Sequence, residues 1–182
     1  MTFREDKAIA LAGLFLYLSG ESQNCLTLNK LMYLAERESL FQICSPITGD
    51  NVVCAEHGPL MKQWFDLLRL QSNQESPIFI ITEEQCVIIK EKVDFNRCLS
   101  PFEMSVAKNI WRKYGHLTQW SNLEWIAETF PEWRPELPQA PIEHAHIFHA
   151  QGLAEFEMRA RTRLEKGLDT FSTLLTQPVV TV

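Results

Sequence analysis

Hydrophobic residues recur at helical spacing over most of the chain, and β-branched runs interrupt this pattern near its middle. Residues 4–19 carry an apolar stripe that predicts a first helix, and residues 27–42 predict a second with Thr27 as its N-cap. A third helix is predicted to begin at Pro59, because proline at the first helical position loses no intrahelical hydrogen bond. Further helices are predicted at 99–114, 121–130, 141–150 and 153–175.

Two of these helix starts carry a capping signature. Ser100 and Glu103 have the spacing of a capping box, and Pro101 stands at the first helical position between them. Ser121 and Glu124 repeat that spacing. We therefore expect one helix to begin after each serine.

The β-branched runs 77–81 and 86–90 flank a short polar stretch, an order that predicts a β-hairpin. Residues 51–55 form another extended run, which we interpret as a third strand of the same sheet. The elements together predict a mainly α fold of the α+β type, with about seven helices and a β-hairpin or three-stranded sheet. The length of 182 residues suits one domain, placed at 1–176, with a frayed tail at 177–182.

Charge and cysteine usage narrow the classes of function. The net charge of −6 argues against a protein that binds nucleic acid mainly through phosphate contacts. Residues 8–18 form the most apolar run, but it is too short to span a bilayer, and its flanks lack the features of a signal peptide. Cysteines occur singly, which favours reduced thiols and a cytoplasmic location. They are Cys25, Cys44, Cys54, Cys86 and Cys98.

The histidines near residue 145 are the nearest candidate for a metal site. His146 and His149 share one helical face, with Glu143 and His144 beside them. A third ligand would have to come from elsewhere, such as His57 or His116, and the spacing of three instead of four favours surface or packing roles. No nucleotide-binding, serine-hydrolase or zinc-protease motif occurs in the sequence. We therefore expect no catalytic residues, no metal and no cofactor.

The stretch His57-Gly58-Pro59 permits two interpretations. Free amides at a helix start bind anions, and His57 would be well placed there as an acid or a switch. Alternatively, Gly58 and Pro59 are structural residues that turn the chain from a strand into a helix. The second interpretation is favoured.

Five tryptophans are more than a small helical core usually needs. Trp64 and Trp111 are assigned to the core. Trp120, Trp125 and Trp133 lie near a proline-rich bend, where an exposed interaction surface and ordinary packing are equally compatible with the sequence.

The order of several segments resembles the Panacea antitoxin domain, a family that includes phage-associated and SocA-like proteins. The most specific segments are LNKLMYLAE, with Lys30 and Tyr33, and CAEHGPL, with Gly58 and Pro59. The segments LSPFEMSVAKNIWRKYG and LEWIAETFPEW follow in the expected order, although Phe130 stands where the family often has histidine.

The resemblance implies an antitoxin without enzymatic activity, which neutralises a cognate protein toxin by direct contact. A proteolytic adaptor that presents the toxin to a protease is the alternative; a DNA-binding regulator or a metal-free enzyme ranks lower. No membrane contact is expected, and a homodimer stays open. The predicted partner-binding residues are Trp120, Trp125, Trp133, Lys30, Tyr33 and His57, and the predicted structural motif is Gly58-Pro59.

Overall fold

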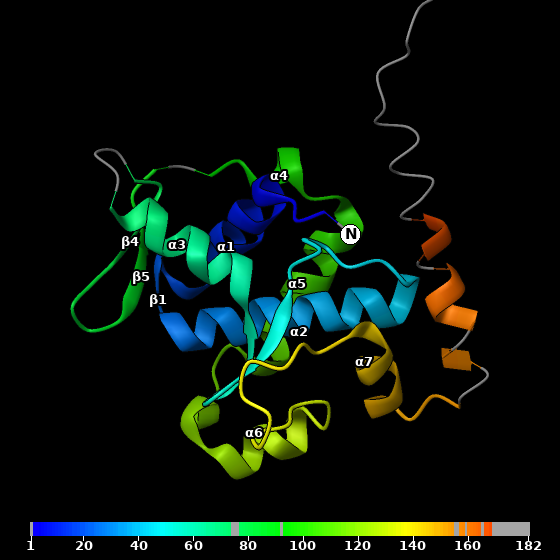
Figure 1. The fold of residues 1–182 in the computed structure, drawn as a ribbon. Helices are drawn as coiled ribbons and strands as arrows, with labels where there is room; N and C mark the ends of the chain where they lie inside the picture. The colour runs from blue at the N-terminus through cyan, green and yellow to red at the C-terminus, as the bar shows by residue number, and fades with distance from the viewer. Residues whose placement is uncertain are drawn as a thin grey trace, which may run out of the picture.

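The computed structural model describes residues 2–73, 77–91, 93–154, 157–158, 160–164 and 166–168. Helix α1 (Glu5–Ser19) packs against the longer α2 (Cys25–Ile43), and α5 (Pro101–Tyr114) contacts both. Figure 1 shows α2 running through the middle of the molecule, with α1 on one side of it and α6 on the other. The prediction of a mainly helical fold with a small β part is confirmed.

Helix α2 begins earlier than predicted. Its N-cap is Asn24, whose Oδ1 accepts hydrogen bonds from the backbone amides of Leu26 at 2.9 Å and Thr27 at 3.3 Å. Asn24 also ends strand β1 (Ser22–Asn24), so its extended backbone suits the N-cap position. Thr27 is therefore a buried residue of the first turn, and its assignment as N-cap was wrong.

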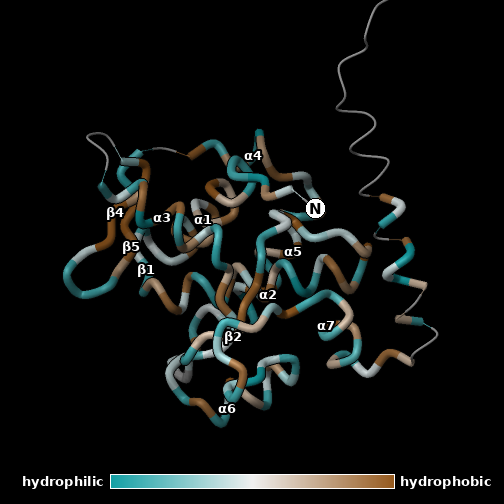
Figure 2. Tube along the Cα trace, viewed as in Figure 1, coloured by the Kyte–Doolittle hydropathy of each residue, from teal (hydrophilic) through white to brown (hydrophobic). Residues whose placement is uncertain are grey.

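The strands of the described residues form two separate antiparallel sheets. Strands β4 (Phe79–Ile81) and β5 (Cys86–Ile89) form the predicted hairpin, and both are hydrophobic along their length (Figure 2). The third strand of that sheet is β1, in the order β1-β5-β4. The expectation that residues 51–55 fill this place was wrong, because β2 (Val52–Ala55) pairs with β3 (Gly58–Met61) instead.

Gly58 and Pro59 consequently lie in a strand and do not start a helix. Residues 56–57 form the turn between β2 and β3, and Gly58 follows it with a positive φ of 108°. Pro59 lies opposite Cys54, which hydrogen-bonds through its own N and O to residues 139–140 on its other side. A proline is tolerated at this position because no ladder hydrogen bond requires its missing N–H.

Helix α3 (Lys62–Ser72) therefore begins three residues after Pro59. The carboxylate of Asp50 binds its first free amides, those of Gln63 at 2.8 Å and Trp64 at 2.7 Å. A carboxylate so placed satisfies donors that have no partner within the helix. The start of α3 is thus capped by Asp50, from the loop before β2, and it lies after the predicted start at Pro59.

The later helices follow the predicted order with shifted starts. The capping box of Ser100 and Glu103 is confirmed at α5, after the short α4 (Phe95–Cys98). A 3-10 turn (Gln119–Ser121) precedes α6 (Leu123–Thr129), whose N-cap is Asn122 and not Ser121. Helix α7 (His144–Ala150) starts later than predicted.

The predicted helix 153–175 lies only partly within the described residues, and the tail 177–182 lies outside them. The described positions at 157–158, 160–164 and 166–168 are helical. Leu164 and Leu168 of its predicted apolar stripe are exposed, so these two positions do not follow the expected burial.

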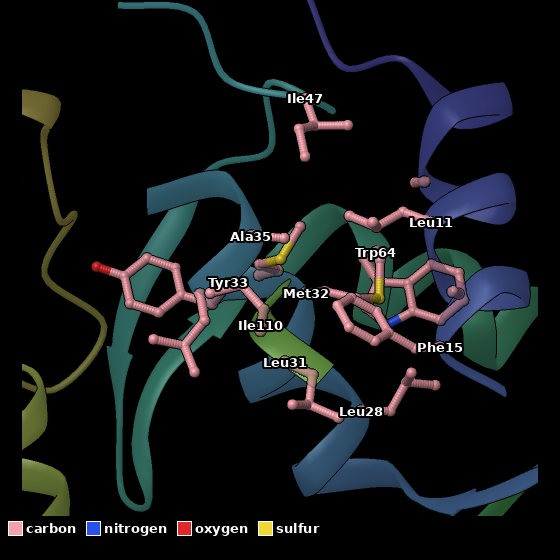
Figure 3. Packing of buried hydrophobic residues seen from close by; sticks show 14 of the residues in the cluster. Leu11, Phe15, Leu28, Leu31, Met32, Tyr33, Ala35, Ile47, Trp64 and Ile110 are labelled. Carbon is pink, nitrogen blue, oxygen red and sulfur yellow. The ribbon is translucent and has the colours of Figure 1, made fainter. Parts of the chain in front are cut away.

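The described core forms one continuous hydrophobic cluster that reaches from α1 to α7. Figure 3 shows Leu11 and Phe15 of α1 facing Trp64 of α3, with Leu28 and Met32 of α2 beside them. In the part of the chain that the structure describes, no helix combines the length and apolar character needed to cross a membrane.

Candidate functional site

Helix α2 carries polar side chains on the side that faces the β2–β3 hairpin and residues 129–132. The positions recur three and four residues apart, so they lie along one face of the helix. We call them the polar row: Asn29, Lys30, Tyr33, Glu36 and Arg37. All are buried except Arg37, which is half-buried. In Figure 3 the hydroxyl of Tyr33 points away from the apolar cluster around Trp64.

Glu132 is the centre of the contacts made by one end of the polar row. Its Oε1 accepts a hydrogen bond from the Tyr33 hydroxyl at 2.5 Å and lies 3.1 Å from Nε of Arg37. Its Oε2 accepts from Nη2 of Arg37 at 3.2 Å, and Nη1 of Arg37 donates to the carbonyl of Thr129 at 3.2 Å. The Glu132 side chain is 0% exposed, so the guanidinium and the phenol replace the water it has lost.

Burial and the carboxylate of Glu132 both act on the pKa of Tyr33. The pKa of Tyr33 is raised well above its ordinary value, first by burial and then by the negative charge of Glu132. Tyr33 therefore stays protonated over the whole physiological range and remains a hydrogen-bond donor.

Lys30 of α2 forms a hydrogen bond to the backbone of the β2–β3 hairpin. Its Nζ donates to the carbonyl of Pro59 at 2.9 Å, which is its single acceptor among the described residues, and the side chain is almost fully buried. Burial lowers the pKa of Lys30 to about 7. A β-carbon on Gly58 would lie 2.9 Å from this Nζ, which explains why glycine occupies that position.

The other members of the polar row also bind backbone groups of distant segments. Asn29 forms a two-way contact with Met61, accepting from its N at 3.3 Å and donating to its O at 3.4 Å. Glu36 accepts from the amides of Ile47 and Thr48 at 2.7 and 2.5 Å, and burial raises its pKa. The polar row thus fixes the loop before β2, the hairpin itself and the segment after α6.

The tryptophans divide between core and half-buried positions. Trp133 is 6% exposed, and its Nε1 donates to the carbonyl of Ala55 at 2.9 Å. Trp120 is 5% exposed and stacks edge-on against the half-buried Trp125, with ring centroids 5.2 Å apart. Ordinary packing, the second of the two alternatives, therefore describes Trp120 and Trp133. Trp64 lies in the core as predicted, whereas Trp111 is half-buried.

His57 and the histidines near residue 145 occupy different surroundings. His57 is exposed in the β2–β3 turn. Nδ1 of His146 accepts a hydrogen bond from the Glu143 amide at 3.1 Å, a capping contact at the start of α7. Across the described ranges, no three His, Cys, Asp or Glu side chains are placed to hold a metal ion.

The structure therefore brings together some of the predicted site residues and adds others. Lys30, Gly58, Pro59 and Trp133 take part in the contacts that hold the β2–β3 hairpin, whereas Tyr33 binds Glu132 in the segment after α6. Four residues of the site, Asn29, Glu36, Arg37 and Glu132, are not among those predicted from the sequence. Their signal was present in α2, where polar residues three and four apart interrupt an apolar helix, but their partners are far away in the sequence.

These contacts define a helical domain whose central helix binds a β-hairpin and a following helical turn through buried polar groups. The family model described as "Antitoxin SocA-like, Panacea domain" matches residues 28–134, more than half of the chain. The chain therefore belongs to the SocA-like Panacea domain family, as its resemblance predicted. No curated protein and no solved structure matches the chain.

The matched range runs from Leu28, the residue before the polar row, to Arg134, the residue after Trp133. It includes Glu132 and both strands of the β2–β3 hairpin. The family's characteristic segments in this chain therefore supply the contacts that position the hairpin and α6.

Replacing Trp133 with alanine is expected to reduce stability before it affects any partner. Removal of a buried indole typically costs about 3–5 kcal/mol, because a cavity remains. Trp133→Phe keeps most of the ring and removes only the donor to Ala55, for which we expect about 1–2 kcal/mol. Denaturant unfolding followed by circular dichroism measures both. If Trp133→Ala unfolds at the wild-type midpoint, the indole does not stabilise the fold.

Stability should rise with pH above neutrality because of Lys30. The folded protein releases this proton near pH 7, whereas the unfolded chain keeps it to about 10.5, so the unfolded state binds more protons between these values. The raised pKa of Cys25, about 11, acts in the opposite direction above pH 9. Between pH 7 and 9 we expect the wild type to gain about 2 kcal/mol relative to Lys30→Met. Parallel curves for the two proteins would show that Lys30 stays charged when folded.

Proposed function

We propose that the protein is a cytoplasmic antitoxin that neutralises a cognate protein toxin by direct contact, without catalysing a reaction and without a cofactor. The observation that carries this proposal is the family match over residues 28–134. That range holds the polar row, the hairpin and α6, so the part of the chain that defines the family is also the part that the buried polar contacts hold rigid.

A rigid surface suits an inhibitor that acts by binding. Ordering side chains and loops on association reduces affinity, and a surface fixed in advance avoids much of this loss. Lys30, Asn29 and Trp133 each bind the backbone of the hairpin, so its exposed turn at 56–57 is held in place before a partner arrives. We propose that residues 1–176 act together as one domain in this role.

Co-expression with the neighbouring gene tests the proposal. The product of the adjacent open reading frame, induced alone, is expected to stop growth, and simultaneous expression of this protein is expected to restore it. The two purified proteins should then elute together from a size-exclusion column. An adjacent product that is harmless, or whose toxicity this protein does not change, would contradict an antitoxin function.

The same experiment separates neutralisation by binding from presentation to a protease. If the protein acts by contact alone, the half-life of the adjacent product stays unchanged while growth recovers. A half-life that shortens several-fold, together with loss of rescue in cells without ATP-dependent proteases, would favour the adaptor.

A further inference from the structure

The outer face of α6 is exposed. Residues Leu123, Glu124, Ala127 and Glu128 recur at helical spacing on this face, and all four are exposed. Leu123 is 47% exposed, although the opposite face of the same helix buries Ile126 completely. A helix that buries one face and exposes a leucine on the other offers an apolar contact to a partner.

The β2–β3 turn and the loop after α6 adjoin this helix. A β-carbon on Gly58 would lie 2.9 Å from Cγ2 of Ile126, so the backbone beside the turn packs on the buried side of α6, opposite its outer face. In the loop, Leu137 is 43% exposed, and the loop is tied to β2 by the hydrogen bond from the Arg134 amide to Sγ of Cys54 at 3.4 Å. Figure 1 shows the turn, α6 and this loop together on one side of α2.

We use the name α6 face for the exposed residues of α6 together with those of the turn and the loop that adjoin it: Glu56, His57, Leu123, Glu124, Ala127, Glu128, Glu136 and Leu137. Its four carboxylates make no ion pair with any other described residue, in contrast to the buried Glu132. Between positions 115 and 140 the sequence contains a single arginine or lysine, Arg134, which is half-buried. The α6 face therefore combines two exposed leucines with uncompensated negative charge.

We propose that the α6 face is the surface that docks the toxin, and that the toxin presents lysine and arginine side chains around an apolar contact. The inference rests on the proposed antitoxin function. Charge complementarity supports a basic protein as the occupant: like charges would repel a nucleic acid from this face, whereas four unpaired carboxylates attract a basic protein and speed its encounter. The leucines supply apolar area that is lost from water only in the complex.

The predicted charge pairing can be tested by reversing two glutamates. We expect Glu124→Lys with Glu128→Lys to slow association with the product of the adjacent gene at least about 10-fold in low salt, because steering by opposite charge acts mainly on the association rate. Leu123→Ser is expected to speed dissociation instead. Surface plasmon resonance at several sodium chloride concentrations measures both rates, and growth rescue gives a second readout.

A matched control places the same charge change elsewhere. Glu83→Lys with Glu84→Lys alters two exposed glutamates in the β4–β5 turn, and we expect its association and dissociation rates and its melting temperature to equal those of the wild type.

If the α6-face variant binds and rescues as well as this control, the docking surface is wrong while the antitoxin function stands. Equal slowing in both variants would show a nonspecific effect of net charge and would also overturn the proposal. A wild-type protein that neither binds nor rescues would overturn both. If promoter DNA or RNA binds to this face, the proposal of a protein partner at this face is wrong.

Discussion

Replacing Glu132 with alanine is expected to lower the free energy of unfolding by about 3–5 kcal/mol, the usual consequence of removing one partner from a buried ion pair. The change leaves the buried Tyr33 hydroxyl and the guanidinium of Arg37 without their acceptor. In a chain of this size, the loss corresponds to a melting temperature lower by roughly 6–20 °C. Differential scanning calorimetry measures it directly.

Asp66→Ala is the matched control for this change. Asp66 pairs with Lys62 on the surface, where both side chains are about half exposed, at 55% and 51%. Exposed pairs contribute about 0–1 kcal/mol, so we expect little effect. If Glu132→Ala destabilises no more than Asp66→Ala, the buried pair does not hold the α6 segment to α2. A double variant, Arg37→Met with Glu132→Leu, should recover part of the loss, because it removes both charges together.

Gly58→Val should have the second large effect on stability. The backbone at Gly58 has a φ of 108°, which a β-branched residue adopts only with strain. Its β-carbon would also lie 2.9 Å from both Ile126 Cγ2 and Lys30 Nζ. Strain of order 1–3 kcal/mol and overpacking of about 1–3 kcal/mol add in the same direction. Chemical denaturation gives the total.

Gly20 separates the two causes. It has a similar positive φ of 85°, but a β-carbon there would meet nothing within 4 Å. We expect Gly20→Val to show the strain alone and Gly58→Val to exceed it by the overpacking. Equal losses would mean that Lys30 and Ile126 move aside without consequence. A stable Gly58→Val that no longer rescues growth would give this position a role in binding.

The elements set by local patterns could be predicted from the sequence. The capping box at Ser100 and Glu103 depends on residues three apart, and it is present as expected. The β4–β5 hairpin follows from two β-branched runs and the turn between them. In each case the groups that decide the structure are neighbours in the sequence, so distant parts of the chain do not change the outcome.

The Gly58-Pro59 error shows where local patterns fail. A proline before an apolar helical stretch satisfies the rule for a helix start, but it also fits a strand where its missing N–H is not needed. The second arrangement prevails because Cys54 bonds to residues 139–140 and because Asp50 caps α3 at a later residue. Both contacts come from segments that the sequence alone does not place nearby.

The candidate site was predictable only in part for the same reason. Lys30 and Tyr33 were found through the family resemblance, but their hydrogen-bond partners, Pro59 and Glu132, are brought to them only by the fold. A tryptophan near proline is compatible with an exposed contact and with ordinary packing, so the sequence alone does not decide between them for Trp133. Its hydrogen bond to Ala55 and its burial can be seen only in the folded chain.

The bond between Tyr33 and Glu132 joins positions 99 residues apart along the chain. A contact of that separation requires closure of a long loop, so we expect it to form only after most of the intervening structure has assembled. Interactions absent from the transition state for folding act mainly on the unfolding rate. Glu132→Ala should therefore leave the refolding rate in stopped-flow experiments nearly unchanged and accelerate unfolding, so that the buried carboxylate sets how long the native protein persists once it has formed.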